Sequence, residues 1–235
     1  DSLQALEYYF TESPLIVVDP VDKDRNVAAA VSRQKLSEFI VAAREFLQEP
    51  SREMFFPLKN EPRNVEELKR AHQNRGTCLI AYVFNHERLN ENIIYGQLRK
   101  TRKAIVKEMQ DRSFKVFKSS IHSNEEDESI ILLEFLVHQL PPIMHHDGPP
   151  IDSEAVHQER FHEKYKNEKP YILGDKWVVD KKRRYTDAIS ASRDLVKHKS
   201  GFGKNFREAK IKIMVGEEVF NIDCEGWRQH LDNVL

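Results

Sequence analysis

Apolar residues recur every three or four positions in several long segments, a spacing that places them on one face of an α-helix. The clearest segment follows Ser32, which we expect to cap a helix that ends near Glu49, just before Pro50. A long helix over 90–112 carries an apolar stripe of Ile94, Leu98, Ile105 and Met109. Further helices are expected at 65–74, 153–167, 186–198, 206–215 and 227–234.

Shorter apolar runs predict strands at 15–18, 78–84, 114–121, 129–137, 171–173, 176–180 and 219–222. The acidic loop 125–128 joins two of these strands as an antiparallel hairpin, and Gly174-Asp175 marks a second, tight hairpin. Strand, helix, strand and strand over 78–137 form the beginning of a split βαβ unit of the ferredoxin-like or RRM-like kind. The expected fold class is therefore α+β.

Proline-rich segments divide the chain. Residues 50–64 hold three prolines beside Phe55-Phe56, and we expect a domain boundary with a packed hinge there. Four further prolines between 140 and 150 indicate the entrance to a subdomain. Within that subdomain, Asp152 or Ser153 is the expected helix cap, and the expected inner side of the helix comprises Val156, Phe161 and Tyr165.

The net charge of −1, from 37 basic and 38 acidic residues, argues mildly against a nucleic-acid binder. The charge is segregated, however, and a neutral total can hide a basic groove. Residues 125–128 are all acidic, residues 181–184 are all basic, and a second basic cluster comprises Arg99, Lys100, Arg102, Lys103 and Lys107. No stretch is apolar enough to span a membrane, and we expect no signal peptide. Because the chain begins with Asp and not Met, we expect it to be a fragment.

Three features suit contact with phosphate, and each has a plain structural alternative. The run Lys181-Lys182-Arg183-Arg184 neutralises phosphates well, and Tyr185 beside it can stack on a base or ribose; the alternative is a solvated turn. The basic face of helix 90–112 is more ordinarily a solvated face. The loop 201–205 precedes a helix but lacks the Walker A spacing, so a phosphate-contacting turn competes with a helix-entry loop.

Metal and catalytic chemistry find little support. His145-His146-Asp147 lies in a proline-rich loop, and His157 and His162 fall on different helix faces, so we expect no metal. The cysteines, Cys78 and Cys224, are far apart, and two reduced thiols are expected although a disulfide is not excluded. Two-metal phosphoryl transfer needs carboxylates that converge from rigid strands, whereas Asp19, Asp22 and Asp24 lie in a turn. No catalytic residue is assigned.

The segment Val17-Val18-Asp19-Pro20-Val21-Asp22-Lys23-Asp24-Arg25-Asn26-Val27-Ala28-Ala29-Ala30-Val31-Ser32 resembles the one that closes the central domain of archaeal CCA-adding enzymes. Its short form, Asp-Pro followed by Asn-Val, also recurs in poly(A) polymerases and oligoadenylate synthetases. The continuation through 39–47, Pro50-Ser51 and Phe55-Phe56-Pro57 narrows the resemblance to the archaeal enzymes. Weaker matches are Arg75-Gly76-Thr77, the helix start at 92–97, Lys176-Trp177 and Gly203-Lys204-Asn205. The resemblance is strong over 15–60 and patchy over 140–200.

The resemblance implies a class I CCA tRNA nucleotidyltransferase, which adds C, C and A to the tRNA 3′ end from CTP and ATP with Mg²⁺. The family's catalytic head, with its Gly-Ser loop and metal-binding aspartates, has no counterpart here. We therefore expect this chain alone to be inactive, with Mg²⁺ confined to the full-length parent and no cofactor in the chain. The implied divisions are 1–55, the end of the helical central domain; 56–140, the split βαβ RNA-binding body; 141–200, an inserted α/β tail subdomain; and 201–235, the return to the body.

The implied partners are the tRNA acceptor stem and T arm, with CTP and ATP bound by the missing head and neck. We expect no membrane association and a cytoplasmic location; a homodimer is left open. The expected turn-organising residues are Asp19, Arg25 and Asn26. The expected tRNA-binding residues are Arg99, Lys103, Lys181, Lys182, Arg183, Arg184, Tyr185, Lys204 and Asn205. The alternatives are a free-standing RNA-binding module without catalytic activity, and an interaction protein whose basic runs are merely solvated.

Overall fold

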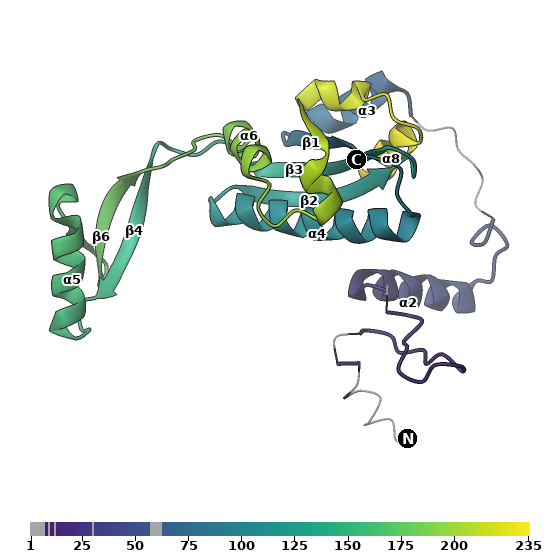
Figure 1. Ribbon diagram of the computed structural model, residues 1–235, viewed down its shortest axis with the longest axis horizontal. Helices are drawn as coiled ribbons and strands as arrows, with labels where there is room; N and C mark the ends of the chain where they lie inside the picture. The colour runs from purple at the N-terminus through teal and green to yellow at the C-terminus, as the bar shows by residue number, and fades with distance from the viewer. Residues whose placement is uncertain (1–7, 9, 12, 30, 57–62) are drawn as a thin grey trace. The chain divides into compact units, whose positions relative to one another are not determined.

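The computed structural model describes residues 8, 10–11, 13–29, 31–56 and 63–235. Internal contacts divide the chain into two units, Asp1–Glu61 and Pro62–Leu235, which are considered separately (Figure 1). The second unit holds two antiparallel sheets and most of the helices, so the fold is α+β, as predicted.

The first unit contains the predicted helix, α2 (Arg33–Gln48), and Ser32 is its N-cap, with Oγ accepting a hydrogen bond from the Lys35 backbone at 3.2 Å. The predicted strand at 15–18 is wrong, because this run makes only a single bridge, between Val18 and Asn26. The side chain of Asn26 competes for the backbone groups that a neighbouring strand would need. It accepts from the Val17 N–H and donates to the Leu15 carbonyl, each at 2.9 Å.

The larger sheet of the second unit has four strands in the order β2-β3-β1-β7, with every neighbouring pair antiparallel (Figure 1). Their bounds are β1 Cys78–Asn85, β2 Lys115–Ser123, β3 Glu128–Val137 and β7 Lys210–Val215. Strands β1, β2 and β3 confirm the predicted runs and the predicted hairpin. With helices α4 (Glu91–Asp111) and α6 (Ala188–His198) between strands, the elements follow the β-α-β-β-α-β order of a split βαβ unit.

Both faces of this sheet are covered by helices. On one face lie α4 and α6, and the predicted α4 stripe is fully buried there against β1 and β3. On the other face lie α3 (Val65–Gln73), the 3₁₀ helix η2 (Gly216–Asn221) and α8 (Trp227–Val234). Strand β1 divides its side chains between the two faces, which explains why its sequence is an almost unbroken apolar run.

The smaller sheet has the order β4-β6-β5 and carries α5 (Ala155–Tyr165) on one face, followed by η1 (Lys166–Glu168). The hairpin of β5 (Tyr171–Leu173) and β6 (Lys176–Lys182) confirms the prediction from Gly174, whose φ is +63°. Strand β4 (Ile143–Pro150) was not predicted. Its two terminal prolines are tolerated because β4 lies at an edge of the sheet, where fewer backbone N–H groups have a strand to pair with.

Several expectations in the second half of the chain are corrected. The predicted helix over 206–215 is instead the short helix α7 (Lys204–Glu208) followed by β7, and the predicted strand at 219–222 is instead the last turn of η2 and the residue after it. Helix α5 starts from Glu154, so neither Asp152 nor Ser153 caps it; the Ser153 hydroxyl instead donates to the Pro150 carbonyl. Phe161 and Tyr165 are buried as predicted, but Val156 is exposed.

Two short segments, 138–142 and 183–187, join the sheets, and we call them the connector. The segments are hydrogen-bonded to each other: the Leu140 N–H donates to the Thr186 carbonyl, and the Arg183 N–H to the Pro142 carbonyl, each at 2.8 Å. Lys181 and Lys182 belong to the end of β6, whereas Arg183 and Arg184 belong to the connector. The basic run of the sequence is therefore divided between two elements.

Candidate nucleic-acid interface

The four basic residues of the run have different surroundings. Lys181 turns onto the α5 side of the small sheet, where its Nζ donates to the Tyr165 hydroxyl at 3.1 Å and lies 4.3 Å from the centre of that ring. Lys182 is exposed and has no ion-pair partner within the described parts of the chain. Of these two strand residues, Lys182 is the one whose charge is free to meet an external phosphate.

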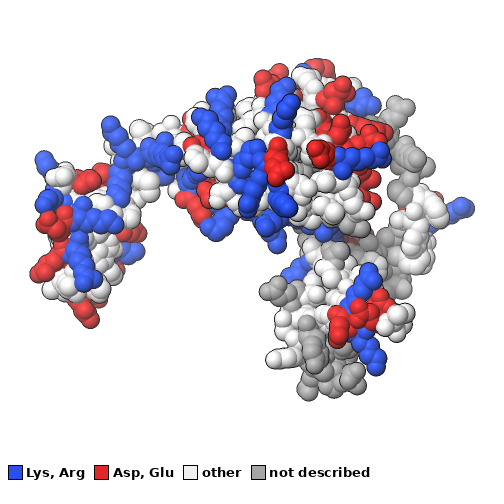
Figure 2. Space-filling model, in the orientation of Figure 1, with Lys and Arg blue, Asp and Glu red and all other residues white. Residues whose placement is uncertain are grey.

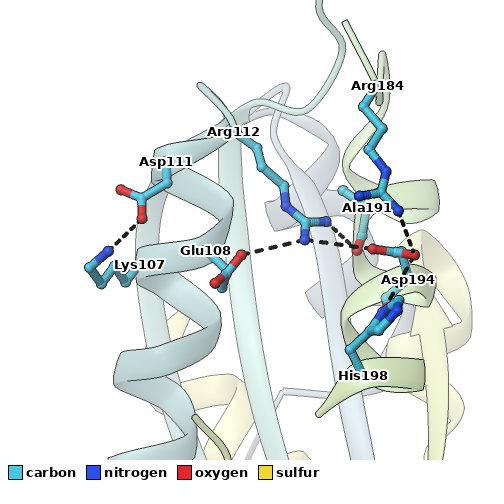
Figure 3. Close-up of polar contacts among 8 residues, drawn as sticks. All are labelled: Lys107, Glu108, Asp111, Arg112, Arg184, Ala191, Asp194 and His198. Atoms are coloured by element: carbon cyan, nitrogen blue, oxygen red, sulfur yellow. Dashed lines mark hydrogen bonds and ion pairs between the residues drawn. The ribbon is translucent and has the colours of Figure 1, made fainter. Parts of the chain in front are cut away.

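Arg184 belongs to a polar cluster around Asp194 of α6 (Figure 3), and Tyr185 is hydrogen-bonded to the same carboxylate. Asp194 lies 3.6 Å from Arg184, 3.7 Å from Arg112 and 3.6 Å from His198. A hydrogen bond from Tyr185 is the largest cause that lowers the pKa of the Asp194 carboxyl, followed by the nearby cations. The cluster ties the connector to α6 and to the end of α4.

The ring of Tyr185 already contacts two guanidinium groups, those of Arg112 at 4.8 Å and Arg184 at 5.2 Å from the ring centre. An aromatic ring engaged by two cations within its own fold is poorly placed to stack on an RNA base. Arg112 is further fixed by a 3.0 Å hydrogen bond to the Ala191 carbonyl. Through these contacts Arg112, Arg184 and Tyr185 hold the connector against α4 and α6.

Arg183 contacts Ser113, just after the end of α4, and has no contact with Asp194 among those described. Its Nη1 donates to the Ser113 hydroxyl at 3.3 Å and lies 3.8 Å from the Met144 sulfur. A pocket of about 170 Å³ opens at this junction, between the end of α4, β4 and the connector.

The basic face of α4 is largely unpaired. Arg99, Lys100 and Lys103 are exposed, and none has an ion-pair partner in the described residues. Arg102 instead donates to the Ser119 carbonyl at 3.4 Å, and Lys107 pairs with Asp111 (Figure 3). Figure 2 shows Lys and Arg side chains gathered where the connector meets α6, while both signs are mixed on the small sheet.

The Gly-containing loop 201–205 owes its glycines to close packing against α4. The Gly203 N–H donates to the buried Thr101 hydroxyl at 2.9 Å, and a Cβ at Gly203 would lie 2.0 Å from the Gln97 side-chain oxygen. Helix α7 has five residues and offers no extended N-terminus for phosphate. Lys204 is exposed, and Asn205 lines a pocket of about 370 Å³ with His86 and Lys210 among others.

Sequence reasoning missed an exposed aromatic on the edge strand β2. Phe117 is 48% exposed at an irregularity in the pairing of β2 with β3. Lys118 and Arg75 lie 5.5 and 5.6 Å from the centre of its ring. The sequence Lys115-Val116-Phe117-Lys118 does not indicate that Phe117 is exposed, because a bulge changes which side chains point away from the core.

The chain matches a family model described as the CCA-adding enzyme, C-terminal domain, over residues 75–216. The chain belongs to the class I archaeal CCA-adding enzyme family. A second model, described as the tRNA nucleotidyltransferase, second domain, matches residues 2–56. The matches confirm the resemblance read from the segment 17–32, and together they cover both units.

Similar CCA-adding enzymes come from several archaea. The enzyme of Methanothermobacter thermautotrophicus is 35% identical over 185 residues, covering 79% of this chain and 40% of that protein. That of Methanoregula boonei is 34% identical over 225 residues, covering 92% of this chain and 48% of that protein. That of Haloarcula marismortui is 27% identical over 228 residues, 88% of this chain and 49% of that protein. The chain thus spans less than half the length of these relatives.

The described residues offer no fitting site for the Mg²⁺ that the CCA-adding enzyme family implies. Within the described residues no group of three or more His, Cys, Asp or Glu side chains could hold a metal. The carboxylates of the turn at 19–24 instead make local contacts. Asp19 accepts a hydrogen bond from the Val21 N–H at 2.9 Å and pairs with Arg25 at 3.7 Å. Asp22 accepts a hydrogen bond from the Asp24 N–H at 3.1 Å. No catalytic step is assigned to these groups.

Local contacts account for the remaining polar residues that the sequence singled out. Asn26 is buried and also accepts from the Ala28 N–H at 3.0 Å. His145 contacts Asp180 at 2.8 Å, and His146 contacts the Tyr165 hydroxyl at 3.0 Å. Cys78 and Cys224 are both free thiols. Among the described helices, none has the length and apolar character to cross a bilayer.

Proposed function

We propose that this chain is the tRNA-holding portion of a CCA-adding enzyme and that it grips the acceptor stem and T arm through their backbone and shape. The observation that carries the proposal is the set of exposed, unpaired cations along α4 and at the end of β6, within a chain of this family. Arg99, Lys103 and Lys182 have no acidic partner among the described residues, so their charge remains available for phosphates.

The covered sheet supports backbone recognition over base recognition. An RRM reads single-stranded bases by stacking them on the open face of its sheet. Here α3, η2 and α8 occupy one face and α4 and α6 the other, so neither face offers a stacking platform. Lysine and arginine contacts to phosphate carry no sequence information, which suits a protein that must serve every tRNA.

In this proposal the addition of C, C and A, the binding of CTP and ATP, and the Mg²⁺ chemistry belong to other domains of the full-length enzyme. The chain alone binds tRNA in the cytoplasm without transferring nucleotides. The small sheet with α5 is the tail that reaches the T arm, and the larger sheet supports the acceptor stem. The alternative is a free-standing RNA-binding module, which would act without any partner domain.

The test is fluorescence anisotropy of labelled tRNA with the 235-residue chain across a salt series. We expect binding to weaken steeply with salt, and an acceptor-stem/T-arm minihelix to bind nearly as well as whole tRNA. An anticodon-arm hairpin should bind much more weakly. Equal binding of all three RNAs would contradict specific recognition of the acceptor stem and T arm, and absence of salt-sensitive binding would refute an RNA role.

Charge reversal at Lys182 tests the surface directly. Lys182→Glu should weaken tRNA binding and make the log–log salt slope shallower by about 1. Arg70→Glu is the matched control, because Arg70 is exposed on α3, on the opposite side of the larger sheet from α4. Equal effects of the two substitutions would remove the end of β6 from the interface.

A further inference from the structure

The pocket at the connector gathers three arginines around a small volume. It measures about 170 Å³ and is lined by Arg112, Ser113, Met144, Arg183 and Arg184, together with neighbouring Asp111 and Tyr185. The end of α4 forms one wall. A helix C-terminus favours cations, which explains why guanidinium groups gather here.

The acidic side chains near the pocket are already engaged by groups other than Arg183. Asp194 serves both Arg112 and Arg184, Glu108 lies 3.4 Å from Arg112, and Asp111 pairs with Lys107 (Figure 3). Arg183 has no carboxylate within ion-pair distance among the described residues. It is therefore the uncompensated charge of the pocket.

Arg183 also carries an unused donor. Its Nε is buried and has no hydrogen-bond partner in the described part of the chain. A buried N–H without an acceptor is costly, by about 1–3 kcal/mol, and more for a charged group, so such groups are uncommon in folded proteins. The guanidinium group of Arg183 therefore has a donor that no acceptor in the described part of the chain uses.

Ser113 adds a second donor in a strained position. Helix α4 ends in a Schellman motif, in which the Phe114 N–H donates to the Met109 carbonyl at 3.0 Å and the Ser113 N–H to the Gln110 carbonyl at 2.8 Å. Ser113 has a φ of +73°, where glycine is the usual residue. Its hydroxyl accepts from Arg183 and keeps its own proton to donate, which a glycine could not do.

We propose that Arg183 and Ser113 form a binding site for one backbone phosphate of the tRNA, a proposal that rests on the proposed function. The Arg183 guanidinium and the Ser113 hydroxyl bind the phosphate oxygens. Arg112, Arg184 and Tyr185 are positioning residues, held by Asp194, that keep the connector against α4. A polynucleotide fits better than a free anion because Lys182, next along the chain, leaves its charge exposed for a further phosphate.

The pocket is tested first without RNA. Inorganic phosphate is titrated into the ¹⁵N-labelled chain while the arginine Nε–Hε signals are followed, with Arg183→Gln identifying the signal of Arg183. We expect that signal to shift saturably, and Ser113→Ala to weaken the response about threefold, the loss of one hydrogen bond. An unmoved Arg183 signal in a folded chain would overturn the site.

The second arm uses tRNA and separates charge from geometry. Arg183→Gln should weaken binding about tenfold and lower the salt slope by about 1. Arg183→Lys should keep the slope but still lose affinity about threefold, because lysine lacks the planar fork of donors. Arg70→Gln, exposed on α3, is the control for loss of one charge.

The outcomes separate the two proposals. If the unmodified chain fails to bind tRNA at any salt concentration, the proposed function fails, whereas the phosphate titration reads the pocket independently. If the chain binds tRNA but Arg183→Gln behaves like Arg70→Gln, the tRNA phosphate site is refuted while the proposed function stands. Circular dichroism checks each variant for folding, and Arg183→Lys and Ser113→Ala still decide the matter if Arg183→Gln does not fold.

Discussion

The position of Ser113 makes a prediction about stability that separates backbone strain from side-chain contact. Replacing Ser113 by alanine or by glycine removes the same hydrogen bond from Arg183. The two variants then differ only in how well they tolerate a φ of +73°. Alanine keeps the steric conflict between Cβ and the backbone, and glycine removes it.

The left-handed conformation costs a non-glycine residue about 1–2 kcal/mol. Glycine also lowers the free energy of unfolding by about 0.4–1 kcal/mol, because it gives the unfolded chain more conformational freedom, and this offsets part of the relieved strain. We therefore expect Ser113→Gly to be more stable than Ser113→Ala by about 1 kcal/mol. For a unit of this size, that difference corresponds to about 2–4 °C in melting temperature.

The measurement is urea and thermal unfolding of both variants, followed by circular dichroism. Lys100 supplies the control, because it is exposed in the middle of α4, where glycine is less stable than alanine by about 1 kcal/mol. The order of the two residues should thus reverse between positions 100 and 113. If alanine is the more stable residue at both positions, Ser113 is not strained, and the reasoning from its positive φ is refuted.

Two further predictions concern the opposite side of the larger sheet. Glu134→Gln should destabilise the second unit by about 3 kcal/mol, because it leaves the partly buried Arg75 without the carboxylate that it contacts at 2.7 Å. The control is Glu163→Gln, which breaks the exposed ion pair with Lys166. It should change the free energy of unfolding by less than about 0.5 kcal/mol. Burial, which is the larger cause, and the neighbouring His122 together lower the pKa of His230 from 6.5 to about 4. The unfolded chain therefore binds a proton at His230 more readily than the folded chain does. The stability that the neutral His230 contributes above pH 6.5 is lost as the pH falls towards 4. After allowance for partial exposure, we expect a loss of about 1–2 kcal/mol in urea unfolding between pH 7 and pH 4, and His230→Gln should flatten that dependence.

The elements with a strong periodic pattern were predictable from the sequence. The stripe on α4 and the unbroken apolar run of β1 left little choice, because each has one arrangement that buries its apolar residues. Strand β7 was missed because Lys210, Ile211, Lys212 and Ile213 directly follow a short helix, and the combined stretch reads as one longer helix. Strand β4 is not predictable in this way because its prolines indicate a loop, although an edge strand accepts them.

The candidate interface was predictable only as a list of charges. The basic run pointed to a candidate segment, but the sequence did not show that Lys181 and Arg184 are engaged within the fold while Lys182 and Arg183 lack acidic partners in the described residues. Those differences depend on Tyr165 in α5 and Asp194 in α6, and the sequence alone does not show that these residues contact the run. The glycines of 201–205 resembled a phosphate loop because close helix packing and phosphate binding both require a missing Cβ.

Hydroxyl-radical footprinting of tRNA bound to this chain tests the central claim most directly, because it reports which part of the RNA backbone the protein covers. The account predicts protection of the acceptor stem and T arm, with the anticodon arm cleaved as in free tRNA. Protection centred on the anticodon arm, or no protection at saturating protein, would contradict it.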